Sequence, residues 1–131
     1  MIKNIEFIKH LGIKQEGNSL TLEPREELLN HLGSIHAGAL FTLAESQSGL
    51  TLIEGFGKVN VKALLRSSSI KYRAEATSKL TAIGSINPKD IKKFNTQLNN
   101  KGRALIDVAV KVLNSEKHTV LTATFNWFIH C

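Results

Sequence analysis

Residues 35–53 decide the fold of this chain, and they read IHAGALFTLAESQSGLTLI. Their apolar side chains cover nearly every face of a helix: Ile35, Ala37, Ala39, Leu40, Phe41, Leu43, Ala44, Leu50, Leu52 and Ile53. A helix that is apolar on all sides has to be buried. The sequence therefore predicts a central helix over residues 35–53 that the rest of the chain encloses.

Most of the remaining sequence alternates between apolar and polar residues, as strands do. Strands are expected at residues 19–22, 59–74, 80–86, 106–112 and 121–129, with residues 114–117 as the turn of a long hairpin. In the second of these the apolar parity changes between Arg66 and Ser69. Because a strand presents every second residue to one face, this change predicts a β-bulge or break.

Three shorter helical segments complete the pattern. Residues 2–11 have apolar side chains at helical spacing and end at Gly12, and residues 25–29 have room for one helical turn. Asn87 is a candidate N-cap before Pro88, and Gly102 ends the helix that follows. The order predicts one α+β domain over residues 1–131, an antiparallel sheet wrapped around a long central helix.

Composition sets limits on function. The 131 residues are 42% hydrophobic and 21% charged, which is typical of a soluble globular protein, and neither a membrane span nor a signal peptide is expected. The single cysteine, Cys131, favours a reducing, cytoplasmic setting. The net charge of +6 favours an anionic partner, but the basic residues are spread from Lys3 to Lys117, which does not favour nucleic acid. No metal is expected.

Glu45 is the one carboxylate inside the apolar helix. Burying an unpaired carboxylate is costly and raises its pKa, so such a group marks a candidate functional site. His36 and Gly38 lie where the helix is expected to begin. Backbone N–H groups at a helix N-terminus are free to stabilise an oxygen that becomes anionic during acyl transfer, and glycine lets a ligand approach them closely.

Residues 30–45, NHLGSIHAGALFTLAE, resemble the signature of the hotdog-fold acyl-CoA thioesterases, the group that includes the phenylacetic-acid-pathway and 4-hydroxybenzoyl-CoA enzymes. In that signature an Asn or Gln precedes a His-Gly-Gly turn, and an acid follows on the helix. Here Asn30 lies six residues before His36, and Glu45 lies nine after it. Ala37 departs from the pattern, which has glycine there. The segment 124–128, TFNWF, is similar to an uncharacterised branch of the same superfamily.

The resemblance implies a hotdog fold and hydrolysis of acyl-CoA, with Glu45 as nucleophile or general base and Asn30 orienting water or substrate. It also implies that His36 holds the turn while the N–H groups of Ala37 and Gly38 polarise the thioester carbonyl. Ser48 and Gly49, about one turn after Glu45, are further candidates for substrate binding. CoA would be substrate rather than cofactor, with Arg66, Lys71 and Arg73 as candidate contacts to it, and a homodimer or a dimer of dimers is expected.

Two other functions remain open at this point. A hotdog dehydratase or hydratase uses a His and an acid, and His31 lies fourteen residues before Glu45, but the Pro-Gly step of those enzymes is absent. A non-catalytic acyl-CoA or lipid-binding protein with the same fold is the other alternative.

Overall fold

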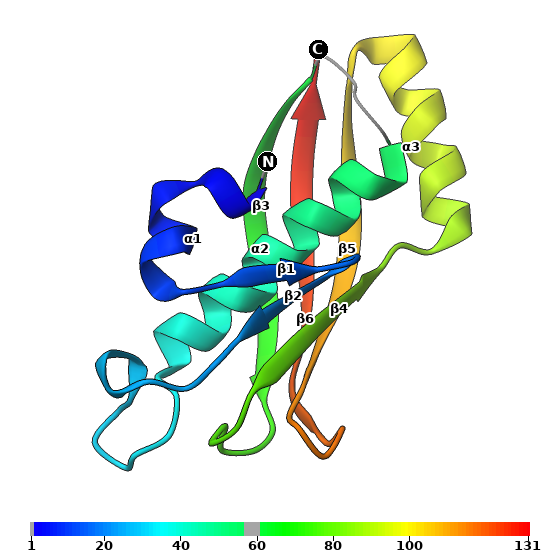
Figure 1. Ribbon diagram of the computed structural model, residues 1–131. Helices are drawn as coiled ribbons and strands as arrows, with labels where there is room; N and C mark the ends of the chain where they lie inside the picture. The colour runs from blue at the N-terminus through cyan, green and yellow to red at the C-terminus, as the bar shows by residue number, and fades with distance from the viewer. Residues whose placement is uncertain (1, 57–60) are drawn as a thin grey trace.

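The computed structural model describes residues 2–56 and 61–131. In chain order the elements are a 3-10 helix η1 (Ile2–Asn4), α1 (Glu6–Leu11), β1 (Lys14–Glu16), β2 (Ser19–Leu22), a 3-10 helix η2 (Glu26–Leu28), α2 (Ala37–Phe56), β3 (Lys62–Tyr72), β4 (Leu80–Ser85), α3 (Pro88–Lys101), β5 (Arg103–Leu113) and β6 (Thr119–His130). Figure 1 shows α2 crossing the strands, with α3 beside β5.

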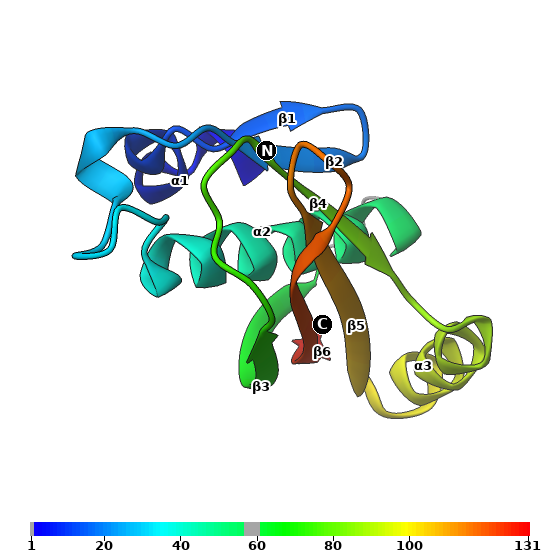
Figure 2. The same ribbon diagram turned by 90° about the horizontal axis from the view of Figure 1, so that it is seen from below.

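The strands form one six-stranded antiparallel sheet in the order β1-β2-β4-β5-β6-β3. Figure 2 shows how the sheet curves so that α2 lies within its concave side. The α+β arrangement predicted from the sequence, a sheet wrapped around one long helix, is confirmed. The long hairpin of β5 and β6 is confirmed as well.

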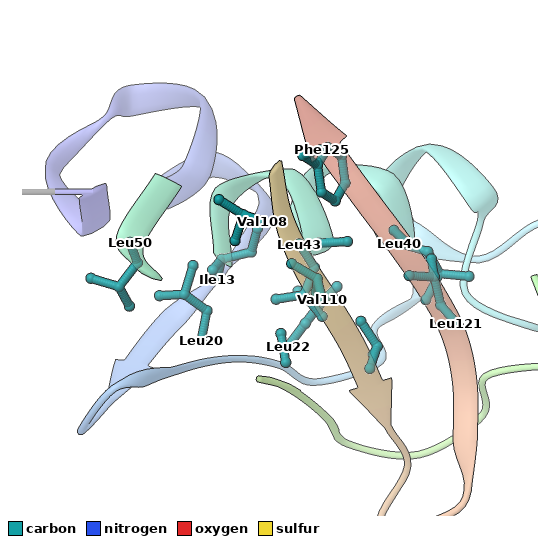
Figure 3. Close-up of a cluster of buried hydrophobic side chains, with 14 of the residues drawn as sticks. Ile13, Leu20, Leu22, Leu40, Leu43, Leu50, Val108, Val110, Leu121 and Phe125 are labelled. Carbon is teal, nitrogen blue, oxygen red and sulfur yellow. The ribbon is translucent and has the colours of Figure 1, made fainter. Parts of the chain in front are cut away.

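The hydrophobic core lies between α2 and the concave face of the sheet. Leu43 and Ala44 of α2 are fully buried, as are Val108 of β5 and Phe125 of β6. Figure 3 shows Leu43, Val108, Phe125 and neighbouring side chains converging from the helix and from the sheet. Because every second residue of β5 faces this core, the intervening residues lie on the convex, outer face.

The central helix begins two residues later than predicted and ends three residues later. The N–H of Ile35 donates to the carbonyl of Ala76, and the N–H of His36 donates to that of Leu28. These bonds hold residues 35 and 36 outside the helix, so α2 starts at Ala37. The short strand β1 was missed because its three residues, Lys14, Gln15 and Glu16, have no apolar alternation.

The predicted irregularity in β3 is confirmed. Its register with β6 shifts between Leu65 and Ser67, which leaves Arg66 as the extra residue of a bulge. The strand begins at Lys62, and the predicted part around Val59 falls outside the described residues. The helical turn predicted for residues 25–29 is the 3-10 helix Glu26–Leu28, and the helix capped by Asn87 is confirmed.

The edge strand β3 is largely uncovered. Helix α2 packs against β2, β4, β5 and β6, and β3 lies beyond the strands that the helix covers. Consequently Ala63, Ser68 and Tyr72 are exposed although they face the concave side, as their partners in β6 do. The outer edge of β3 therefore offers a long row of backbone groups to another strand.

Gly84 of β4 lies close against α2. A Cβ added at Gly84 would overlap the Thr51 side chain, lying 2.9 Å from its Cβ atom. We expect Gly84→Ala to lower the free energy of unfolding by roughly 1–3 kcal/mol, because α2 or β4 has to shift. Urea denaturation measures the change.

Gly55→Ala is the matched control, since a Cβ there meets only ordinary contact with Ile86 at 3.5 Å. That variant should be unchanged or more stable by up to about 1 kcal/mol, because alanine favours helix. Equal stability of Gly84→Ala and the wild type would show that α2 and β4 are not packed this closely.

Candidate active site

Glu45 lies on the face of α2 that is turned toward β6 and the open edge of β3. Phe41 and Ser48 share this face, since they are four residues before and three after Glu45. The Phe41 ring contacts that of Phe125 edge to face with centroids 5.9 Å apart, and the Ser48 Oγ accepts a hydrogen bond from Trp127 Nε1 at 3.0 Å. Glu45 is thereby placed between Phe125 and Trp127 of β6.

The position of β3 follows from its register. Ser68 is paired with Phe125, and Leu65 with Trp127, so the bulge at Arg66 lies level with Glu45 on the neighbouring strand. Because α2 does not cover β3, the Glu45 side chain is half-buried. The carboxylate is therefore partly exposed, on the side of α2 nearest the edge strand.

The Glu45 carboxylate takes part in no ion pair or hydrogen bond with the described residues. Burial alone raises its pKa above the ordinary value for glutamate. A carboxylate with a raised pKa is a better proton acceptor than an ordinary one once it is ionised. This combination of partial burial, missing partner and access is the one expected of a general base or nucleophile.

Ser48 and Gly49 are packed against the sheet. The Ser48 hydroxyl is fully buried and is committed twice, because it also donates to the Glu45 carbonyl at 2.6 Å. A Cβ at Gly49 would lie 3.5 Å from Ile2 and 3.8 Å from Trp127, so this face of the helix is closely packed. In this structure both residues hold α2 against β6 about one helical turn after Glu45, and the Ser48 hydroxyl is fully buried with its proton already donated.

The start of α2 is organised by His36. Its Nδ1 accepts a hydrogen bond from the Gly38 N–H at 2.8 Å, so the side chain caps the helix. The predicted role of His36 in holding the turn agrees with this geometry. The Gly38 N–H, however, is occupied. Among the described residues the Ala37 N–H has no partner, and it is the free donor at this helix end.

Asn30 holds the loop before the helix. Its Oδ1 accepts from the N–H groups of Leu32 at 2.9 Å and Ser34 at 3.1 Å. The backbone of Asn30 also bonds to Ser34 and Gly33. The side-chain oxygen is thus used in positioning residues 30–34, and only its amide NH₂ is left for water or substrate.

Helix geometry separates the two halves of the predicted site within one chain. Gly38 and Glu45 are seven residues apart on α2, which is about 10 Å along the axis at 1.5 Å per residue. A single thioester carbonyl cannot contact both the start of this helix and this carboxylate. The structure therefore gathers Asn30, His36, Ala37 and Gly38 at one end of α2, and Glu45 with Ser48 and Gly49 near its middle.

The three predicted CoA contacts also lie apart. Arg66 lines a hollow together with Lys101 and Arg103. Lys71 and Arg73 line another hollow further along β3, where Arg73 Nε donates to Thr122 at 2.9 Å. No single phosphate group can contact all three side chains at their present positions.

Two residues that support the site carried no recognisable signal of this role in the sequence. Trp127 belongs to the alternating strand and to the segment 124–128, but nothing in the sequence places it at the site, where it bonds to the turn of α2 that carries Glu45. Gln47, buried in the same helix, accepts from the Leu20 N–H at 2.8 Å and donates to the Asn18 carbonyl at 3.0 Å. A buried amide in an apolar helix signals a structural bond of this kind, but the partners are distant in sequence.

Within residues 2–56 and 61–131, no group of three or more His, Cys, Asp or Glu side chains is placed to hold a metal ion. Over the same residues, no helix is both long and apolar enough to cross a membrane.

An antiparallel sheet wrapped around a central helix, with the carboxylate on that helix facing the open sheet edge, defines a hotdog-fold protein. The chain belongs to the family described as domain of unknown function DUF4442, whose profile matches residues 8–129. Among curated proteins, none matches the chain.

Solved structures show the same fold. A Pseudomonas aeruginosa protein of unknown function, described as a probable thioesterase, has a TM-score of 0.86 at 20% identity over 98% of this chain and 90% of that one. A Bacillus halodurans protein solved with CoA has a TM-score of 0.75 at 22% identity, covering 94% and 74%. A Streptococcus mutans protein bound to acetyl-CoA has a TM-score of 0.64 at 30% identity, covering 85% and 78%.

The raised pKa of Glu45 predicts a stability change with a definite sign. The folded state holds this proton more tightly than the unfolded chain, so ionisation of Glu45 lowers the free energy of unfolding as the pH rises from the unfolded pKa to the folded one. We expect Glu45→Gln to be more stable than the wild type at pH 7. The difference should shrink toward zero below a pH of roughly 4, the ordinary pKa of glutamate.

Urea denaturation at the two pH values measures this difference. Glu54→Gln, at an exposed position of the same helix, is the control and should change stability little at either pH. A Glu45→Gln variant that is less stable than the wild type at pH 7 would mean that the carboxylate has a stabilising partner.

Proposed function

We propose that this protein hydrolyses acyl-CoA thioesters to CoA and a carboxylic acid, with Glu45 as the catalytic carboxylate. The observation that carries the proposal is Glu45 on α2, which is half-buried, has no partner among the described residues and has a pKa raised by burial. The reaction needs no cofactor, since the CoA thioester is the substrate. A cytoplasmic setting, inferred from the single cysteine, is part of the same proposal.

Thioester hydrolysis requires a general base or nucleophile, and a hydrogen-bond donor to the carbonyl oxygen. As general base, Glu45 takes a proton from water while the water oxygen adds to the thioester carbon. As nucleophile, it adds to that carbon itself, and water then hydrolyses the resulting anhydride. In both routes the C–S bond breaks and CoA leaves as a thiolate that is then protonated. The free Ala37 N–H, at the positive end of α2, is suited to stabilise the intermediate oxyanion.

Ala37 and Glu45 are eight residues apart on α2, about 12 Å along the axis, and this separation requires the two groups to come from different copies of the chain. We therefore propose a homodimer in which the β3 edges of two copies pair, so that the helix start of each faces the Glu45 of the other. The long uncovered edge of β3 and the exposed concave-side residues Ala63, Ser68 and Tyr72 support this contact. Association into a dimer of dimers is compatible with it.

The related structures also support a function in acyl-CoA hydrolysis. The Pseudomonas aeruginosa protein is described as a probable thioesterase, and two others hold CoA or acetyl-CoA. The finer resemblance to the phenylacetic-acid and 4-hydroxybenzoyl-CoA enzymes stays a prediction. For the dehydratase alternative, His31 is exposed in the loop before α2, and no contact with Glu45 links the two residues.

Removal of the Glu45 carboxylate should abolish turnover. We expect Glu45→Gln to lower kcat by roughly 10²-fold or more on every acyl-CoA that the wild type hydrolyses. Release of free thiol from a panel of short, medium, long and aromatic acyl-CoAs measures this. Because Glu45 has to be ionised, wild-type kcat/KM should fall as the pH drops through its raised pKa.

Glu54→Gln should retain wild-type turnover on the same panel. Acyl-CoA binding without hydrolysis by the wild type would favour the non-catalytic binder, and hydration of an enoyl-CoA would favour the hydratase. Full activity of Glu45→Gln would end the proposed role of this residue.

Complementation tests whether the site is shared. Ala37→Pro removes the free N–H, at a helix position where proline is tolerated, and should be inactive. Mixed one to one with Glu45→Gln and allowed to exchange subunits, it should recover activity at about a quarter of the wild-type sites, since half of the dimers are mixed and each holds one complete site.

Ala37→Gly keeps the N–H and should stay active, which separates loss of the donor from loss of the side chain. Sedimentation equilibrium should show twice the 14.5 kDa chain mass, and Tm should rise with protein concentration. An active monomer, or a mixture as inactive as its components, would contradict a shared site.

A further inference from the structure

The convex face of the sheet carries two unlike rows of side chains at the end where β3 begins. Register places Lys62 of β3, His130 of β6 and Arg103 of β5 opposite one another. The next outward-facing row consists of Leu64, Phe128 and Leu105. A row that carries the cationic side chains of Lys62 and Arg103 therefore lies beside an apolar row that has an aromatic ring at its centre.

Next to these rows is a hollow of about 210 Å³, here called the basic hollow, lined in part by Arg66, Lys101, Arg103, Leu105 and Phe128. Arg66 reaches it from the bulge of β3, and Lys101 from the last turn of α3. Its volume is below the roughly 300–1,000 Å³ of pockets that enclose a whole small molecule. The hollow is therefore sized for one end of a larger ligand.

The positive charges of the basic hollow are not neutralised within the described residues. The described residues form three ion pairs, and none of these pairs involves Arg66, Lys101 or Arg103. Asp107 of β5 lies one outward row further on, where it accepts a hydrogen bond from Asn126 at 2.8 Å. Like charges close together on a sheet are unfavourable, so an anion that contacts them is stabilised.

We infer that the basic hollow binds the nucleotide end of CoA, an adenosine carrying a 3′-phosphate and a 5′-diphosphate. This inference rests on the proposed function. Arg66, Lys101 and Arg103 contact the phosphates, while Phe128 and Leu105 form the wall against which the adenine ring packs. Aromatic side chains and arginine planes both stack on purine rings.

The position of the basic hollow relative to Glu45 fits one continuous ligand. Arg66 lies in the bulge beside Trp127, the residue that bonds to Ser48 one turn from Glu45. The hollow is on the convex side of the sheet and Glu45 on the concave side; Arg66 is level with Glu45, and the rest of the hollow lies toward the start of β3. The pantetheine arm then crosses at the Arg66 bulge, where β3 bends and its ladder is irregular at the boundary with the partner copy of the proposed dimer.

The second basic group on this face, Lys71 and Arg73, fits a nucleotide less well. The Arg73 side chain already donates to Thr122, and no aromatic residue is among those that line its hollow. Among the predicted CoA contacts Arg66, Lys71 and Arg73, the structure thus favours Arg66. It adds Lys101 and Arg103 as candidate contacts to the nucleotide.

The test compares two thioesters of the same acyl group, one on CoA and one on N-acetylcysteamine, which lacks the nucleotide. For Arg66→Ala/Arg103→Ala we expect KM for the acyl-CoA to rise at least 10-fold with little change in kcat. The kcat/KM for the truncated thioester should stay at the wild-type value. Lys111→Ala, an exposed lysine on the same strand and face as Arg103, is the matched control and should match the wild type on both.

A binding experiment keeps the inference separate from hydrolysis. Calorimetric titration with adenosine 3′,5′-bisphosphate should show binding to the wild type and to Lys111→Ala, and at least 10-fold weaker binding to Arg66→Ala/Arg103→Ala. If no thioester is hydrolysed but this difference is found, the basic hollow stands and the proposed hydrolysis fails. Unchanged KM for acyl-CoA, equal losses on both thioesters, no bisphosphate binding by the wild type, or a loss found only in Lys71→Ala would overturn the inference.

Discussion

The burial of α2 by the curved sheet is the constraint on which the rest of the structure depends. The helix is apolar on nearly all sides, and β2, β4, β5 and β6 provide most of the surface that covers it. Inside this layer Gln47 and Ser48 are satisfied by bonds to Leu20 and Trp127 of the sheet, whereas the buried Ser46 hydroxyl has no hydrogen-bond partner. The Glu45 carboxylate also has none among the described residues, and it faces a side of α2 where the cover is incomplete.

Much of the fold could be predicted from the sequence because two periodicities are so clear. The all-round apolar helix and the alternating strands leave few ways to bury both surfaces. The parity change in β3 even located the bulge at Arg66. The predicted start of the central helix, at Ile35, was wrong. The N–H of Ile35 donates to the carbonyl of Ala76, which is 41 positions away in the sequence. Hydrogen bonds between distant segments have no signature in a periodic pattern.

The candidate site was predicted in part for the same reason. Glu45 could be found because a carboxylate in an apolar helix is conspicuous, and its raised pKa follows from that burial. The hydrogen bonds that the other candidate residues make could not be predicted from the sequence. Asn30 is tied to its own loop, and the Gly38 N–H is tied to His36. Such short-range bonds depend on rotamers that sequence spacing does not specify, and they leave Ala37 as the free donor.

Because α2 leaves the concave side of β3 uncovered, the same edge of the sheet bears on both the Glu45 site and the proposed dimer. If α2 were covered completely, the Glu45 carboxylate would have no route to a substrate, and the edge strand would have no exposed concave side. Since the rise of the helix keeps Glu45 about 12 Å from the Ala37 donor at its own N-terminus, a catalytic role for both requires a second chain at this edge. In the proposed dimer a paired edge would bury Glu45 further, which raises its pKa, while the positive end of the partner's helix would oppose that rise.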